Sequence, residues 1–262
     1  MSVITESNGV EQTVLAVDTD ERPVDFVIMI DGSGSFHRSL ASAQKAAEIL
    51  IQQKRPADEV LIARFVTKDK IENVHNFTTD TQGPVQALAS FTSEGGRSAV
   101  IDALYAAAEH VARHNRGEDR RKAVVIITDG EDRQSARNTN ALVKLLREQQ
   151  VQVFAIGLTG DLYEEAGYIR ESPRARAEKL LTTVAEESGG RVFFPRKEGE
   201  LFRDVTPQIV ANLWAQFRIK YRSSNSTGKD FRKIEVKIAS PKGEKRKAIV
   251  RRGYYAPKGP SS

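Results

Sequence analysis

An acid and two hydroxyls stand at alternate positions where the first strongly apolar run of the chain ends. The run VDFVIMI (24–30) is followed by Asp31, Ser33 and Ser35, with a glycine between each pair. Four kinds of feature fit this cluster: a phosphate-binding loop, a nucleophilic serine, a metal site or a plain turn. Carboxylate and hydroxyl oxygens are hard ligands that suit Mg²⁺, Mn²⁺ or Ca²⁺. A metal site therefore ranks among the first chemistries to consider.

The phosphate and nucleophile interpretations lack their sequence patterns. A phosphate loop needs GxxxxGK[ST] or GxGxxG, and a nucleophile elbow needs GxSxG. The stretch DGSGSF contains neither. We interpret the nearby His37 as a surface residue rather than as a catalytic base. The metal interpretation is favoured, with the plain turn as its ordinary alternative.

Two other segments carry polar groups of the same kind. Asp129 follows the apolar run VVIIT, and Ser98 opens a helical stretch after a glycine pair. Each has an ordinary explanation alone, because serine and aspartate also cap helices and Asp-Gly is a common turn. The carboxyl ends of parallel strands meet at one edge of a sheet, where such sheets bind ligands. We therefore expect Ser98 and Asp129 to join Asp31.

The hydrophobic pattern predicts the elements that position these residues. Five apolar runs, most of them continuous, predict strands buried on both faces of a parallel sheet. They are residues 24–30, 59–65, 122–128, 151–157 and 191–195. Helical periodicity occurs at residues 38–54, 99–113, 138–149, 173–188 and 201–214. This alternation predicts an α/β fold: a doubly wound, mostly parallel, Rossmann-like sheet with helices on both faces.

Two segments depart from this alternation. Residues 71–77 follow the second strand after the link TKDK, which is too short for a crossover, so they predict an antiparallel edge strand. Residues 216–262 alternate polar and apolar positions, which predicts an antiparallel β extension that could continue the main sheet. The extension carries 14 Lys/Arg against 3 Asp/Glu, whereas the rest of the chain carries 26 against 32. We interpret it as a solvated basic edge, because it lacks an aromatic-rich RNA-binding motif.

Together the three polar segments resemble the von Willebrand factor type A (VWA) domain. DGSGS, GGRSAVIDAL and TDG occur in that family's order and spacing, over roughly residues 22–215. The resemblance implies a metal-ion-dependent adhesion site that holds Mg²⁺, or else Mn²⁺ or Ca²⁺. Its implied ligands are Asp31, Ser33, Ser35, Ser98 and Asp129.

One ligand position departs from the family pattern. The family usually has threonine where this chain has Ser98. Serine keeps the hydroxyl but loses the methyl group that restricts its rotamer, so we expect somewhat weaker metal affinity. Arg97, Glu131 and Asp132 are expected to line the rim, where a partner binds. Asp102 is interpreted as a helix-surface or supporting residue.

A narrower resemblance concerns the two ends of the chain. NGVEQTVLAV and YRSSNSTGKDFRKIEVKI are similar to segments of the bacterial VWA-related group first noted in acidobacteria. It implies three parts: residues 1–21, the remnant of an upstream domain; residues 22–215, the VWA domain; and residues 216–262, the basic extension. It also implies an extracytoplasmic location for the full-length protein. The sequence itself contains no signal-peptide core and no apolar run that could span a membrane.

These observations restrict the function. The chain of 262 residues has no cysteine, which excludes thiol catalysis, thiolate metal sites and disulfides. The resemblance implies a binding module that captures an Asp or Glu side chain of a protein partner, and not an enzyme. A metal-assisted phosphohydrolase is the first alternative, although the second acid of a DxD pattern and a phosphate-binding lysine motif are missing. The other alternative is binding of nucleic acid or an acidic surface through the basic extension.

Overall fold

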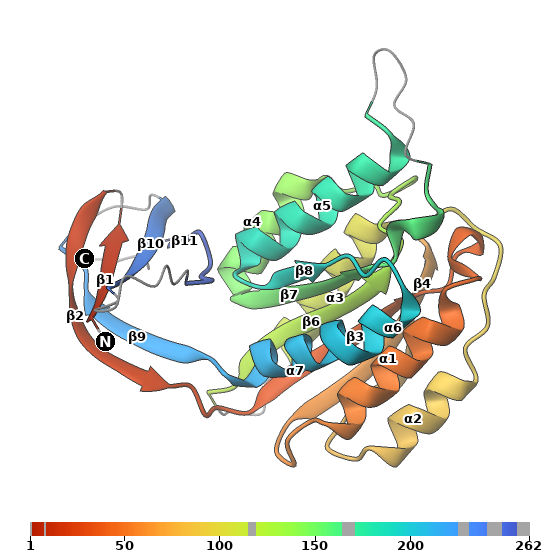
Figure 1. Cartoon of the computed structure of the whole chain (residues 1–262), viewed down its shortest axis with the longest axis horizontal. Helices are drawn as coiled ribbons and strands as arrows, with labels where there is room; N and C mark the ends of the chain where they lie inside the picture. Colours follow the sequence, from red (N-terminus) through yellow and green to blue (C-terminus); the bar gives the residue numbers. More distant parts are fainter. Residues whose placement is uncertain are drawn as a thin grey trace.

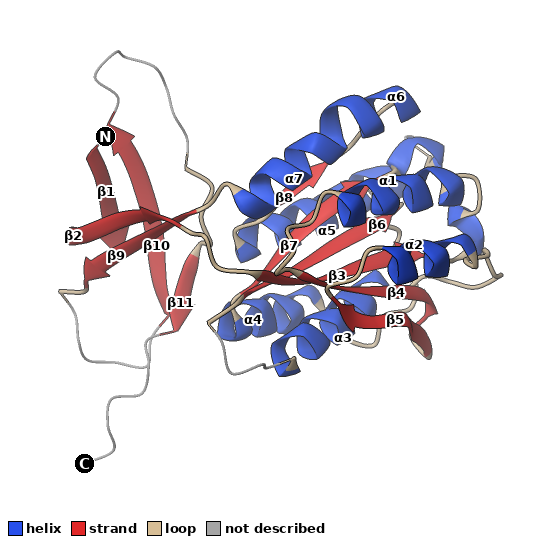
Figure 2. Ribbon diagram, turned by 90° about the horizontal axis from the view of Figure 1, so that it is seen from below, coloured by secondary structure: helices blue, strands red, loops and turns tan. Residues whose placement is uncertain are grey.

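A computed structural model gives the fold of residues 2–7, 9–114, 119–163, 171–224, 231–239 and 248–255. These residues form two β-sheets, and helices cover both faces of the larger one (Figure 1). Figure 2 shows the smaller sheet to one side of the helical body. The candidate ligands belong to the body.

The larger sheet has six strands in the order β5-β4-β3-β6-β7-β8. They are β3 (Val24–Asp31), β4 (Glu59–Thr67), β5 (Lys70–Thr78), β6 (Arg121–Thr128), β7 (Val151–Gly157) and β8 (Arg191–Phe193). All neighbours pair in parallel except β4 and β5, so the antiparallel edge strand is confirmed. The chain runs from β3 to β4 on one side and later returns to β6 on the other. The switch point lies at the carboxyl ends of β3 and β6, where open α/β sheets bind ligands.

Helices pack on both faces of this sheet, as predicted. One core joins β3 to α1 (Leu40–Gln52), α2 (Gln82–Ala89) and α7 (Thr206–Trp214). The other joins it to α3 (Val100–Arg113), α4 (Thr139–Gln149) and α5 (Pro173–Ser188). Alternate residues of β3 enter the two cores, which explains its continuous apolar sequence. Shorter helical turns are η1 (Gly34–Phe36), η2 (Thr159–Asp161), α6 (Glu198–Glu200) and η3 (Leu201–Val205).

Two helical predictions need correction. No helix was expected at α2, whose eight residues include Pro84; proline is tolerated there because it lies in the first turn. The predicted helix 201–214 begins as one turn of π-helix, η3, and becomes α-helical only at Thr206. Thr206 is buried, and its hydroxyl donates to the carbonyl of Leu201 at 2.7 Å.

The smaller sheet has five antiparallel strands in the order β11-β10-β1-β2-β9. They are β1 (Ser2–Ser7), β2 (Val10–Thr19), β9 (Phe217–Arg222), β10 (Phe231–Ala239) and β11 (Gly253–Tyr255). The C-terminal extension therefore belongs to the smaller sheet, and the prediction that it could continue the main sheet is wrong. The N-terminal segment, expected as the remnant of a separate domain, supplies two strands to the same sheet as the extension, with Ser2 opposite Ala239.

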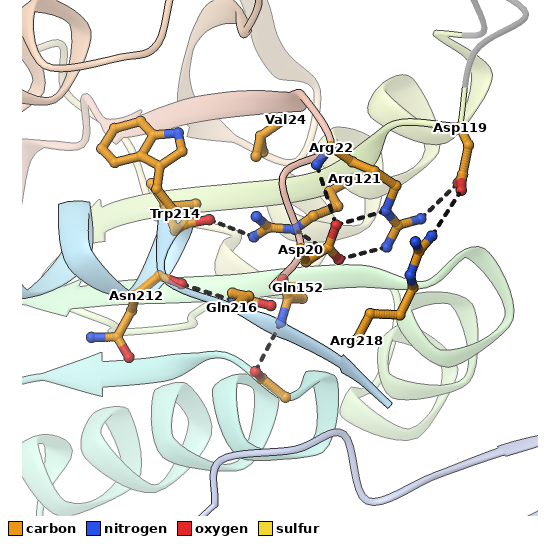
Figure 3. Close-up of polar contacts among 12 residues, drawn as sticks. Asp20, Arg22, Val24, Asp119, Arg121, Gln152, Asn212, Trp214, Gln216 and Arg218 are labelled. Atoms are coloured by element: carbon orange, nitrogen blue, oxygen red, sulfur yellow. Dashed lines mark hydrogen bonds and ion pairs between the residues drawn. The ribbon is translucent and has the colours of Figure 1, made fainter. Parts of the chain in front are cut away.

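A polar network joins the smaller sheet to the body (Figure 3). Asp20, just after β2, receives two hydrogen bonds from the guanidinium of Arg22, at 2.8 and 2.7 Å. Asp119, just before β6, pairs with Arg22 at 2.6 Å and lies 3.8 Å from Arg218 of β9. On the far side of the junction, Arg252 pairs with Glu186 of α5 at 2.7 Å. The smaller sheet is thus fixed to the body at two places.

Candidate functional site

Asp31 ends β3 and is fully buried, with both carboxylate oxygens engaged. Its Oδ1 accepts the backbone N–H of Ser33 at 2.9 Å. Its Oδ2 accepts the hydroxyl of Thr128, the last residue of the neighbouring strand β6, at 2.6 Å. These two bonds fix the orientation of the carboxylate at the switch point of the sheet.

The loop after Asp31 brings the two serine hydroxyls together. Oγ of Ser33 lies 3.3 Å from Oγ of Ser35, which belongs to the turn η1. A second loop holds this one from outside: the hydroxyl of Ser93 donates to the carbonyl of Ser33 at 2.9 Å, and the N–H of Glu94 donates to the carbonyl of Gly32 at 2.9 Å. These two hydrogen bonds hold the backbone of the loop that carries both serine hydroxyls.

Asp129 follows β6 and faces the same point. Its Oδ1 accepts the N–H of Glu131 at 2.9 Å, and the nearby hydroxyl of Ser35 lowers the pKa of this carboxyl. Its Oδ2 is buried and has no hydrogen-bond partner. The turn depends on Gly130, which has φ 77° and would place a Cβ against Leu181. A buried carboxylate oxygen without a donor is costly, so this atom needs a positive or donating ligand.

Ser98 joins the group through the loop that follows Asp129. It is buried, and its hydroxyl donates to the carbonyl of Glu131 at 2.5 Å. Its own carbonyl accepts the N–H of Arg133 at 2.9 Å. The structure therefore brings four of the predicted residues close together: Asp31, Ser33, Ser35 and Asp129. The fifth, Ser98, is bonded to the loop that follows Asp129.

Burial and mutual repulsion disfavour two negative charges at this point. Burial, together with the charge of Asp129, raises the pKa of Asp31 to about 7, although bonds from Thr128 and Ser33 act against this rise. Burial also raises the pKa of Asp129 above its ordinary value, while bonds from Glu131 and Ser35 oppose it. A divalent cation balances two carboxylates and would satisfy the unpartnered Oδ2. The all-oxygen donor set thus fits Mg²⁺, Mn²⁺ or Ca²⁺.

The expected rim residues line one hollow beside this point. Arg97, Glu131 and Asp132 surround a space of about 540 Å³ together with Pro173 and Arg176 of α5. Both acids are partly exposed there.

Each rim acid has a partner within its own loop. Glu131 pairs with Arg133 at 2.5 Å. Asp132 accepts the hydroxyl of Ser135 at 2.5 Å and the N–H of Ile101 at 3.3 Å, so it also caps the start of α3. Of the three expected rim residues, only Arg97 has an exposed side chain.

Two supporting residues were missed or only partly anticipated. Thr128 carries the bond to Asp31, and its only signal was a hydroxyl at the last position of an apolar strand. Asp102, expected as a surface or supporting residue, is buried and accepts the N–H groups of Ala136 and Arg137 at 2.7 and 3.1 Å. It holds the loop that follows Asp129 onto α3.

A second set of ligand-type side chains lies at the opposite edge of the sheet. Oxygens of Asp25 and Glu59 and a ring nitrogen of His114 lie within 4.8 Å of one another. Asp25 pairs with Arg120 at 2.6 Å, and Glu59 with His114 at 2.6 Å. Each of the two acids thus already has a side-chain partner in the fold. In the described part of the chain, every helix is too short or too polar to cross a membrane.

Comparison with known proteins agrees with this fold. The family model of the von Willebrand factor type A domain matches residues 25–208. No curated protein matches the chain. Similar solved structures include an aerotolerance-related membrane protein from Bacteroides fragilis carrying multiple mutations to serine, with 20% identity and a TM-score of 0.56 over 71% of this chain and 98% of that one.

Two further solved structures are similar in fold. A von Willebrand factor type A protein from Catenulispora acidiphila has 19% identity and a TM-score of 0.59, over 80% of this chain and 50% of that one. Proximal thread matrix protein 1 from the mussel byssus has 17% identity and a TM-score of 0.55, over 79% and 50%. At these identities the likeness concerns the fold.

Proposed function

Because the chain belongs to the von Willebrand factor type A domain family, whose members commonly mediate protein interactions, we propose that it is a divalent-metal-dependent protein-binding module. Members of this family often bind a divalent metal and are usually not enzymes. The proposal adds a specific ion site, a specific set of ligands and a chemical class of partner.

The unpartnered Oδ2 of Asp129 is the observation that carries the proposal. It is buried close enough to Asp31 for the negative charge of Asp129 to raise the pKa of Asp31. A cation bound here would both neutralise this repulsion and give the unpartnered oxygen a ligand. Mg²⁺ is the expected ion, with Mn²⁺ or Ca²⁺ as alternatives. The ligands would be Asp31, Ser33, Ser35, Ser98 and Asp129.

The partner would present an aspartate or glutamate side chain. An ion held by two carboxylates and neutral hydroxyls keeps positive character toward a further carboxylate, and Mg²⁺ commonly leaves positions open to other ligands. The exposed guanidinium of Arg97, at the adjoining hollow, can add a charge-assisted hydrogen bond to the same partner. Shape recognition would then come from the hollow between the Asp129 loop and α5.

The hydroxyls at this point favour binding over covalent chemistry. The hydroxyls of Ser33 and Ser35 lie 3.3 Å from each other, and that of Ser35 is also near Asp129, whereas nucleophilic catalysis needs a serine beside a general base. His37 is exposed, and its Nδ1 lies 3.1 Å from the carbonyl of Gly34. The phosphohydrolase alternative, the acidobacterial-type subgroup and the extracytoplasmic location stay predictions.

The test is a calorimetric titration of Mg²⁺ and Mn²⁺ into metal-free protein. We expect one saturable site in the wild type, and loss of binding in Asp129→Asn and in Asp31→Asn. Asp18→Asn is the matched control, because this exposed acid of β2 lies far from the site along the fold. Equal binding by all four proteins would place the ion elsewhere and refute the assignment of the ligands.

Capture of an acidic partner needs its own measurement. An immobilised library of peptides that each contain one Asp or Glu is incubated with the protein, with and without Mg²⁺. Retention that depends on Mg²⁺ and disappears in Asp129→Asn supports the proposal. Retention that is the same for peptides with Asn or Gln in place of the acid would show that the partner carboxylate is not recognised.

A further inference from the structure

A further cavity lined by described residues lies between the smaller sheet and the body. Its volume is about 530 Å³, within the range of small-molecule sites. It is lined by the start of β6 and the end of α4 on the body side, and by β1, β9 and β10 on the sheet side. It lies at the edge of the main sheet opposite the candidate metal site, because β6 begins here and ends there.

The lining of this cavity is strongly basic. Seven arginine or lysine side chains and three aspartate or glutamate side chains line it. The excess of positive charge would be repulsive without an anion or water between the cations. Burial lowers the pKa of the guanidiniums of Arg121 and Arg251 from its ordinary value, which shows that these charges are poorly solvated where they stand.

Unpartnered polar atoms gather at the same place. In the described part of the chain, five buried side-chain atoms have no hydrogen-bond partner, and one of them is the Oδ2 of Asp129. The other four all belong to residues that line this cavity: Thr5 Oγ1, Arg121 Nη1, Arg147 Nε and Arg218 Nε. Buried donors normally find partners, so four together indicate a common acceptor.

Each of the three arginines is also held in place by other bonds. Arg121, whose side chain is only 5% exposed, donates through Nη2 to the carbonyl of Leu213 at 2.5 Å. Arg147 pairs with Glu187. Arg218 lies beside Asp119, as Figure 3 shows, at 3.8 Å. The protein therefore orients these guanidiniums through some of their N–H groups and leaves others available.

We propose that this cavity binds a small organic anion whose phosphate or carboxylate group is held by Arg121, Arg147 and Arg218. Forked guanidinium donors match the geometry of both groups. Apolar side chains such as Leu146 and Ile219 also line the cavity and suit the carbon part of the ligand. Because the arginines come from both the body and β9, the bound anion also holds the smaller sheet against the body.

The experiment titrates pyrophosphate and citrate separately into metal-free protein and follows binding by calorimetry. Metal is removed with a chelator, and the chelator is then removed by gel filtration, because it is itself a polycarboxylate. Without metal, the candidate ion site cannot bind either probe through a cation. The stronger probe identifies phosphate or carboxylate as the preferred group.

Arg218→Gln and Arg147→Gln are the test variants. Each is expected to weaken binding roughly tenfold or more, since a hydrogen bond between charged groups is lost. Arg222→Gln is the matched control: it makes the same change on the same strand, at an exposed residue away from the cavity, and is expected to bind like the wild type. Arg218→Lys, which keeps the charge but not the fork, is expected to lie between the two.

Several results would overturn the proposal. One is that Arg222→Gln weakens the affinity for the probes as much as the test variants do. Another is that the affinity is unchanged in both test variants. The third is that neither probe binds saturably in the millimolar range. Circular dichroism of each variant separates a loss of binding from a loss of fold. If Arg147→Gln does not fold, Arg218→Gln and Arg218→Lys decide the matter, because Arg218 lies on a partly exposed edge strand.

Discussion

Raising the pH should destabilise the metal-free protein through Asp31. The pKa of this buried carboxyl is raised to about 7, whereas in the unfolded chain it returns to its ordinary value of 3.8. Between these two values the folded protein holds a proton that the unfolded chain has lost. The free energy of unfolding must therefore decrease as the pH rises through this window and level off above it.

The difference between the two pKa values sets the size of the effect. It is close to three, and each pKa difference of one corresponds to about 1.4 kcal/mol, so the loss between pH 4 and pH 8 is at most about 4 kcal/mol. A domain of ordinary stability has about 5–15 kcal/mol in total. The free energy of unfolding of the metal-free protein should thus be clearly lower at pH 8 than at pH 5.

Urea unfolding of metal-free protein at pH 5 and pH 8 measures this difference. Asp31→Asn is the control, because it keeps the side-chain shape but cannot lose a proton; histidines and other groups that titrate in this range contribute equally to both proteins. The change in the free energy of unfolding between the two pH values is therefore larger in the wild type than in Asp31→Asn, and the excess is the contribution of Asp31. Identical responses of wild type and Asp31→Asn would refute the reasoning.

Addition of Mg²⁺ at pH 8 should reverse the loss. A ligand that binds only the folded state at 100 times its dissociation constant stabilises it by about 2.7 kcal/mol. Because protons compete with the ion for Asp31, Mg²⁺ affinity should increase as the pH rises from 5 to 8. An affinity that is independent of pH would mean that Asp31 is already ionised without metal, or is not a ligand.

Three further predictions concern residues that support the site and the fold. Thr128→Val removes the hydroxyl that donates to Asp31 at 2.6 Å and should weaken Mg²⁺ affinity about tenfold by calorimetry, and unchanged affinity would refute its supporting role. Asn138→Ala removes the N-cap of α4, whose side chain accepts an N–H at 2.9 Å, and should cost about 1 kcal/mol in urea unfolding; a loss near zero would show that the cap is dispensable. Gly190→Ala would press a Cβ against the backbone of Val153 and should cost about 3 kcal/mol or prevent folding, so a variant with wild-type thermal stability would contradict the packing described.

The main sheet was predictable because its local pattern and its tertiary role agree. A strand such as β6 is apolar at every position since both faces pack on helices, and this continuous pattern is visible without a structure. The same argument located the candidate ligands, because residues just beyond such strands must lie at one edge. Asp31 and Asp129 do lie at one edge, close enough for the charge of Asp129 to raise the pKa of Asp31, while their role as ligands stays a prediction.

The smaller sheet was predictable only in part. The alternation in β9 and β10 was visible, but their partners lie at the other end of the chain: β10 pairs with β1, and β2 pairs with β9. Strand pairing over such distances depends on the whole fold, and strand β2 has few buried side chains and an irregular register near Val14. A largely exposed strand of this kind does not indicate its partner.

The aspartates near the site show why residue type alone did not distinguish candidate metal ligands from residues that only hold the loops in place. Asp102, Asp129 and Asp132 are all buried or partly buried, and all accept backbone N–H groups. What distinguishes Asp129 is the second oxygen, which the loop leaves without a donor, whereas both oxygens of Asp102 bond to N–H groups at residues 136 and 137. The number of N–H groups that a loop presents to each carboxylate is a property of the folded backbone. The buried free oxygen, more than the residue type, therefore sets Asp129 apart from the aspartates that only support the loops.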